Sequence, residues 1–145
     1  MKKTQLFFVA LLSAFTLVFT SCDKEEETKD TDPTLYERLG EQAAIEAVVD
    51  QFITNVAADT RINSFFPTTD IPRLKRLLVE QICQATGGPC EYTGRDMKSS
   101  HAGLGITTDD FNALVEDLVA ALDEFNVPAA EQSELLGILG PLAPD

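Results

Sequence analysis

Apolar residues recur every three or four positions from Leu35 onward, which is the spacing of an amphipathic α-helix. The run "TLYERLG" predicts a short helix that ends at Gly40. The following run, "EQAAIEAVVDQFITNVAAD", predicts a long helix. Its apolar face is formed by Ala44, Ile45, Val48, Val49, Phe52 and Val56. The segment "TRINSFFPTTD" then breaks the pattern as a short aromatic corner that Pro67 ends.

The second half of the chain predicts three more helices. Asp70 is expected to cap a helix that carries Leu74, Leu77, Leu78, Val79 and Ile82 and stops at Gly87-Gly88-Pro89. "TTDDF" predicts the next helix start, because a Thr or Asp cap and early acidic residues suit the positive end of a helix dipole. Pro128 opens the last helix. Four substantial helices, irregular joints and no convincing strand pattern predict an all-α domain.

The first residues have a different pattern. Lys2 and Lys3 precede an apolar run that is short for a membrane span, and Thr20-Ser21 precede Cys22. Residues 1–21 are therefore expected to be a lipoprotein-type signal peptide, with the lipid on Cys22. The alternative is a plain signal peptide followed by an incidental cysteine.

Residues 22–34 are charged and carry no apolar side chain, which predicts a disordered acidic tether before a folded domain at 35–145. With a lipid on Cys22, the protein is expected outside the cytoplasm, anchored to a membrane and either periplasmic or displayed on the cell surface.

The charge balance limits the class of partner. The chain has 24 acidic residues against 11 Lys and Arg, for a net charge of −13. Binding to nucleic acid depends on Lys and Arg that neutralise phosphates, so a nucleic-acid partner is not expected. The domain also carries Cys83 and Cys90. Outside the cytoplasm they could form a disulfide, and two buried free thiols are the alternative.

His101 is the only histidine of the chain and lies in the Gly-rich segment "YTGRDMKSSHAGLGI". One histidine cannot complete an all-protein metal site, but haem needs only one axial imidazole from the protein. A haem pocket also needs apolar and aromatic walls, for which Phe65-Phe66, Leu74, Leu78 and Met97 are candidates. Candidate cations for the haem propionates are Arg73, Lys75, Arg95 and Lys98. The alternative interpretation is that His101 is a surface residue and that Phe66, Leu74 and Leu78 belong to an ordinary hydrophobic core.

Several blocks together resemble the group I truncated haemoglobins. "LYERLG" with "AAIEAVVDQFI" is similar to their opening helices, "DTRINSFF" to the stretch that ends in their haem-contacting Phe, and "GGPCEYTGRDMKSSHAGLGIT" to the loop with the proximal His. The resemblance implies a two-over-two helical sandwich around haem b, with His101 as the iron ligand. It also implies that Phe66 packs on the porphyrin. Together with the candidates above, the residues expected around the cofactor are Phe66, Leu74, Leu78, Met97, Arg73, Lys98 and Phe111.

The departures from the family concern the distal side, where the family commonly has Tyr and Gln. The matching positions are Ile53 and Leu78, and Leu74 takes the position of the distal gate. None of the three can donate a hydrogen bond, which would weaken retention of dioxygen more than of carbon monoxide or nitric oxide. Gln81 is the nearby polar residue that could supply a donor.

The implied function is reversible binding of a diatomic gas (O2, NO or CO) without catalytic residues. Nitric oxide dioxygenation would need an external reductase. Two other functions stay open from the sequence: haem capture and transfer, and a haem-free interaction lipoprotein on a globin scaffold.

Overall fold

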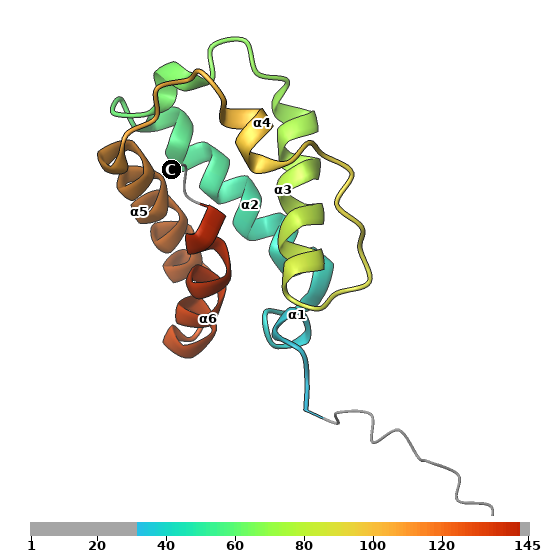
Figure 1. Ribbon diagram of the computed structural model, residues 1–145. Coiled ribbons are helices and arrows are strands. Elements are labelled where there is room, and N and C mark those ends of the chain that lie inside the picture. Colours follow the sequence, from blue (N-terminus) through green and yellow to red (C-terminus); the bar gives the residue numbers. More distant parts are fainter. Residues whose placement is uncertain (1–31, 143–145) are drawn as a thin grey trace, which may run out of the picture. The chain divides into compact units, whose positions relative to one another are not determined.

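The computed structural model describes residues 32–142 (Figure 1). The predicted signal peptide, Cys22 and most of the predicted tether lie outside these residues. The elements in chain order are α1 (Leu35–Arg38), α2 (Glu41–Ala58), the 3-10 turn η1 (Asn63–Phe65), α3 (Ile71–Ala85), α4 (Met97–His101), α5 (Thr108–Glu124), α6 (Ala129–Leu139) and the 3-10 turn η2 (Gly140–Leu142). Residues 32–142 contain no β-strand. The prediction of an all-α domain is therefore confirmed.

Side-chain caps fix where the helices begin. The predicted caps Asp70 and Thr107 accept hydrogen bonds from the backbone of Arg73 and Asp110. Thr34, the last residue of the predicted tether, instead caps α1 through a reciprocal pair of hydrogen bonds with Glu37. The ordered fold therefore includes Thr34.

A left-handed glycine makes the turn between α1 and α2. Gly40 has φ 91°, and a Cβ added there would lie 2.9 Å from the Cβ of Ala44. A side chain at this position would meet both backbone strain and a steric clash. Gly40 therefore allows α2 to start immediately after α1.

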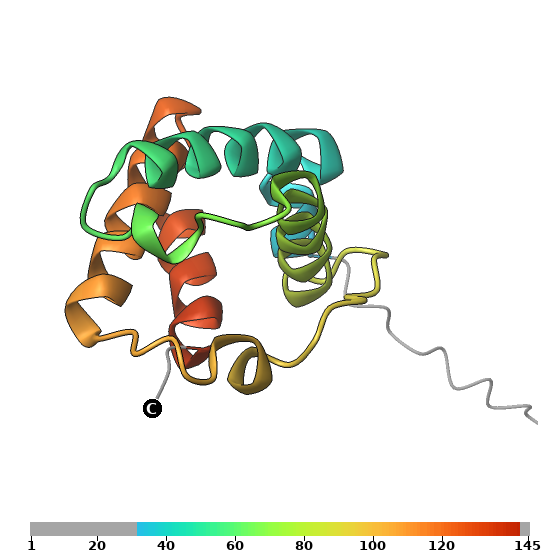
Figure 2. The same cartoon turned by 90° about the horizontal axis from the view of Figure 1, so that it is seen from above.

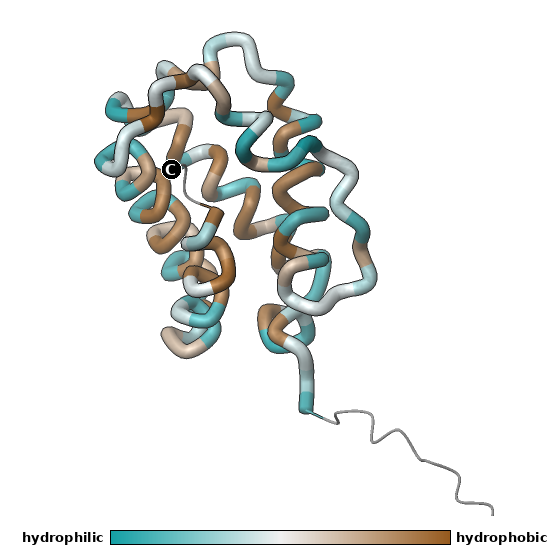
Figure 3. Tube along the Cα trace, viewed as in Figure 1, coloured by the Kyte–Doolittle hydropathy of each residue, from teal (hydrophilic) through white to brown (hydrophobic). Residues whose placement is uncertain are grey.

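The hydrophobic core forms where α2 packs against α3 and α5. Val49 of α2 and Ala121 of α5 are completely buried. Figure 3 shows apolar positions on the sides of the helices that face one another and polar positions on their outer sides. None of the helices within residues 32–142 is long and apolar enough to cross a membrane.

The short helix α4 lies apart from this core. Seen from above, it is on the side opposite α2, between the end of α3 and the start of α5 (Figure 2). None of its five residues is buried. The fold thus places the only histidine on an exposed helix of little more than one turn.

Candidate functional site

A pocket of roughly 380 Å³ opens between α2, η1, α3, α4 and α5. This volume is within the range of about 300–1,000 Å³ that is usual for small-molecule and cofactor sites. The pocket is lined by Phe52, Ile53, Val56, Ala57, Asn63, Phe66, Ile71, Leu74, Leu78, His101 and Leu114. Only Asn63 and His101 in this set are polar. The pocket is therefore an apolar slot with one imidazole at its wall.

The orientation of the His101 ring is set within α4. Its Nδ1 lies 2.8 Å from the main-chain oxygen of Met97, one turn earlier. Because a carbonyl can only accept, Nδ1 carries the proton in this contact, and Nε2 of the neutral ring keeps its lone pair. The ring is thus prepared to act as a metal ligand through Nε2.

A cap at the start of α4 supports this arrangement. The Asp96 carboxylate accepts a hydrogen bond of 2.8 Å from the Ser99 amide. Hydrogen bonds from Ser99, aided by the nearby charge of Arg95, hold the pKa of Asp96 below its usual range. Asp96 is therefore ionised at neutral pH, which is the form that caps a helix best.

Four apolar residues that the sequence predicted for the site line this pocket. Ile53 of α2 and Leu74 and Leu78 of α3 line the pocket, and Phe66 follows η1 at its corner. All four are partly exposed despite being hydrophobic, as expected of side chains around a hollow. None of them carries a hydrogen-bond donor.

Three other predicted site residues do not line the pocket. Gln81 donates to the sulfur of Met97 at 3.6 Å, so these two residues contact each other between α3 and α4. Phe111 is half-buried in the first turn of α5, and Leu114, one turn later, reaches the pocket instead. Helical spacing alone did not decide which turn of α5 faces the slot. Gln81 is consequently not a distal donor in this structure.

The predicted propionate cations fall into two groups. Lys75 forms an ion pair with Asp50 of α2. Arg73, Arg95 and Lys98 form no ion pair within residues 32–142, and all three are exposed. None of them lines the pocket, although Arg95 and Lys98 flank the start of α4.

The pocket also contains residues that the sequence did not single out for it. Phe52 and Val56 were expected only as core positions of α2, and Asn63, Ile71 and Leu114 had no predicted contact with a ligand. Asn63 lies in a segment with many other polar residues, so the sequence offered no signal that would single it out. Ile71 is 41% exposed at the start of α3, which fits a pocket rim.

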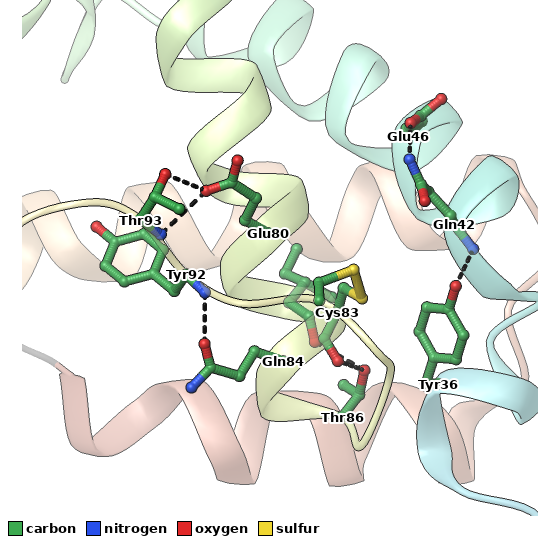
Figure 4. The surroundings of a disulfide bond; sticks show 11 residues. Tyr36, Gln42, Glu46, Glu80, Cys83, Gln84, Thr86, Tyr92 and Thr93 are labelled. Atoms are coloured by element: carbon green, nitrogen blue, oxygen red, sulfur yellow. Dashed lines mark hydrogen bonds between the residues drawn. A yellow bond between two sulfur atoms is a disulfide. The ribbon is translucent and has the colours of Figure 1, made fainter.

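Cys83 and Cys90 form a disulfide with a Cα–Cα distance of 5.7 Å (Figure 4). The bridge joins the last turn of α3 to the loop that leads to α4. Of the two alternatives that the sequence left open, the structure thus has the disulfide and not two free thiols. Within residues 32–142, no group of three or more His, Cys, Asp or Glu side chains could hold a metal ion.

Comparisons with known proteins agree with this architecture. A model of the bacterial-like globin family matches residues 34–145. The chain is 42% identical over 112 residues to a group 1 truncated haemoglobin of Mycolicibacterium paratuberculosis, covering 77% of this chain and 82% of that protein. It is 35% identical over 111 residues to a group 1 truncated haemoglobin of Synechocystis, covering 74% of this chain and 90% of that protein.

Solved structures show the same fold. The truncated haemoglobin of Tetrahymena pyriformis in its Fe(III) form matches with a TM-score of 0.73 and 32% identity, over 75% of this chain and 93% of that one. The 2/2 haemoglobin of a Synechococcus species, in the cyanomet state with covalently attached haem, matches with a TM-score of 0.70 and 36% identity, over 74% and 91%. The predicted fold is confirmed, and the chain belongs to the group 1 truncated haemoglobins.

Proposed function

We propose that this protein binds haem b through His101 and uses it to bind diatomic gases reversibly. The observation that carries the proposal is the contact between His101 Nδ1 and the Met97 carbonyl at the wall of an apolar pocket. It leaves Nε2 of the only imidazole in the chain free for an iron ion. Membership of the truncated haemoglobins supports haem as the cofactor.

The residues around the pocket fit haem. The walls are apolar, as a porphyrin ring requires, and Phe66 offers an aromatic face. When bound, haem would supply an iron ion that His101 could ligate and that could take up a gas. Arg73, Arg95 and Lys98 are the cations without a carboxylate partner in the described part of the chain, so they are available for the propionates.

The cysteines support haem b over haem attached through thioethers. Cysteine-linked haem uses a C-x-x-C-H sequence, which this chain lacks. Its two domain cysteines, Cys83 and Cys90, are bonded to each other. Non-covalent contacts and the His101 ligand would therefore hold the cofactor.

The distal wall determines which gas is retained. A hydrogen bond to a charged group contributes roughly 1.5–3 kcal/mol, and Ile53, Leu74 and Leu78 can provide none. Dioxygen depends on such a donor because it gains negative charge on ferrous iron, whereas carbon monoxide and nitric oxide depend on it less. We therefore infer that the pocket favours carbon monoxide and nitric oxide over dioxygen, relative to a pocket with Tyr and Gln.

The function is binding and not turnover by this chain alone. Nitric oxide dioxygenation requires an electron donor after each cycle, which would be an external reductase. Titration of the ferrous, haem-loaded protein with the three gases tests the proposal. Binding of carbon monoxide and nitric oxide with rapid loss of dioxygen supports it, and failure to take up one haem per chain contradicts it and leaves the haem-free interaction protein.

We also propose that the protein is a lipoprotein anchored outside the cytoplasm through a lipid on Cys22. The support comes from the signal-like residues 1–21 and from the disulfide. Structural disulfides form and persist in oxidising compartments and are rare in the cytosol. Such a location would also suit haem capture and transfer, which a fast loss of haem to an acceptor protein would indicate.

A further inference from the structure

The loop between α3 and α4, residues 86–96, returns along the outer side of α3, and we call it the strap. It is attached to the last turns of α3 (Figure 4). Cys90 of the strap is bonded to Cys83, Tyr92 contacts Gln84, and Thr93 contacts Glu80, one turn nearer the start of the helix. The strap is therefore attached to α3 over more than one helical turn before it reaches α4.

Hydrogen bonds to two side chains of α3 hold the middle of the strap. The Tyr92 amide donates to Gln84 Oε1 at 2.5 Å. Both the amide and the hydroxyl of Thr93 donate to Glu80 Oε2, at 3.1 Å and 2.7 Å. Arg76 forms an ion pair with Glu80 and also donates to the Thr93 hydroxyl at 3.0 Å. The Glu80 carboxylate thus binds the strap at both the backbone and a side chain.

The end of the strap leads directly to the histidine. The Tyr92 hydroxyl donates to the main-chain oxygen of Arg95 at 2.9 Å, one residue before the cap of α4. Gln81 of α3 contacts the sulfur of Met97, whose carbonyl holds the His101 ring. A continuous set of contacts therefore connects the disulfide to the imidazole.

The helix α4 cannot hold its own position. Isolated helices shorter than about 12–15 residues are marginal in water, and α4 has five residues, none of them buried. Its place must come from the Gln81–Met97 contact and from the segments attached at its two ends. At its N-terminal end, that attachment is the strap.

We propose that the Cys83–Cys90 disulfide and the Glu80 carboxylate are positioning groups for His101, which hold the strap so that α4 presents the imidazole and haem is retained. The inference rests on the proposed haem binding. It makes haem retention dependent on the redox state of the bridge. A dithiol reductant would break the S–S bond, leave a thiol on each cysteine and itself become a disulfide, so that two electrons and two protons pass to the protein.

Access to the bridge is one-sided. The Cys83 side chain is completely buried, whereas Cys90 is half-exposed on the strap. Thiol–disulfide exchange proceeds by attack of a thiolate on one sulfur, so we expect attack at Cys90, with Cys83 as the leaving thiolate. The reduced strap would then be held only by its hydrogen bonds.

The test compares the oxidised protein with the same protein treated with a dithiol, both loaded with haem. Two quantities are measured: the rate of haem transfer to an excess of an acceptor apoprotein, and the iron–histidine stretching frequency by resonance Raman. We expect reduction to speed haem loss about tenfold. This is less than the roughly sixtyfold change in a folding equilibrium that a disulfide closing an eight-residue loop can produce. The stretching frequency is expected to shift or broaden.

Matched variants separate positioning from general stability. Glu80→Ala keeps the disulfide but removes both hydrogen bonds from Thr93 to the carboxylate, and should speed haem loss at least about threefold. Glu116→Ala removes a carboxylate of α5 that pairs with Arg61, away from the strap, and should leave both quantities unchanged. In the double variant Cys83→Ala/Cys90→Ala, haem loss should be fast and should no longer respond to the dithiol.

Hydrogen exchange of the haem-free protein tests the strap without the cofactor. The Ser100 amide, which donates to the Asp96 carbonyl, should exchange faster after reduction. If the protein takes up no haem, the proposed function is wrong. If the exchange rate of the Ser100 amide is also unchanged by reduction, the disulfide does not position α4. If haem binds through His101 but its loss rate and stretching frequency ignore both reduction and Glu80→Ala, the bridge only stabilises the fold and our inference is wrong.

Discussion

The Nδ1 atom of His101 lies 2.8 Å from the main-chain oxygen of Met97, within the same short helix. This contact fixes the ring tautomer from inside α4, without a carboxylate partner. The ring and the helix therefore move together, so the position of α4 determines where Nε2 points. Because α4 is exposed and short, the geometry of the candidate haem site depends on its cap at Asp96 and on the loop before it.

A donor placed in the distal wall should slow the loss of dioxygen. Ile53→Tyr would bring a hydroxyl to the pocket wall, and the dioxygen off-rate is expected to fall by about ten- to a hundredfold because a hydrogen bond to a charged group contributes roughly 1.5–3 kcal/mol. Ile53→Phe is the matched control, since it adds the ring without the hydroxyl. Stopped-flow kinetics would contradict the apolar-pocket account if the unmodified protein already lost dioxygen as slowly as Ile53→Tyr.

Loss of the cap of α5 should destabilise the fold. Thr107 accepts a hydrogen bond of 3.2 Å from the Asp110 amide, and Thr107→Ala removes it at a cost of about 1 kcal/mol. Urea unfolding followed by circular dichroism measures the change. Thr108→Ala, one residue later and outside the capping pair, should have much less effect, and equal effects of the two variants would contradict the role of the cap.

The reciprocal half of this cap should make stability depend on pH. Hydrogen bonds from Thr107 hold the pKa of Asp110 below its usual range. A carboxylate with a lowered folded-state pKa stabilises the fold above its unfolded pKa, and this contribution is lost as the pH falls through the folded value. Asp110→Asn should therefore lower the urea midpoint at pH 7 and differ less from the parent protein at pH 3. If the difference between the two proteins were the same at pH 3, the ionised Asp110 carboxylate would not be the source of the stabilisation.

Asp117 should show the opposite pH dependence. Its Oδ2 is buried without a hydrogen-bond partner, and burial, with the charges of Asp59 and Glu116, raises its pKa above the usual value. The ionised form therefore costs stability above the folded pKa, and the cost is relieved as the pH falls toward the unfolded pKa. Asp117→Asn is expected to raise the free energy of unfolding at pH 7 by about 1 kcal/mol. Thermal unfolding at pH 7 and pH 3.5 checks this, and a destabilised variant at pH 7 would show that the carboxylate is required.

Helix positions were predictable because caps, glycines and apolar spacing are local signals. Asp70, Thr107 and the Gly40 turn lie where the sequence indicates. The pocket was only partly predictable, since its lining joins five separate elements. Gln81 shows the reason: it is three residues from Leu78 on the same helix, yet it contacts Met97 and not the pocket. That choice depends on where the strap places α4, which no local pattern encodes.

The proposed anchor can be tested at Cys22. If this residue carries the lipid, the exported protein should partition into the detergent phase and have a mass that includes acyl chains. Cys22→Ser should abolish both properties and leave haem binding unchanged, because the family match begins at residue 34. An exported Cys22→Ser protein that still partitions with detergent would rule out lipidation at this cysteine.

The most direct test of the central claim is the absorption spectrum of the haem-loaded protein beside His101→Ala, with Ser100→Ala in the same helix as the control. We predict a Soret band and a ferrous carbon monoxide spectrum typical of histidine-ligated haem in the parent and in Ser100→Ala. These features should be lost or displaced in His101→Ala and restored by added imidazole. A spectrum that is the same in all three proteins would show that His101 is not the iron ligand and would contradict the account.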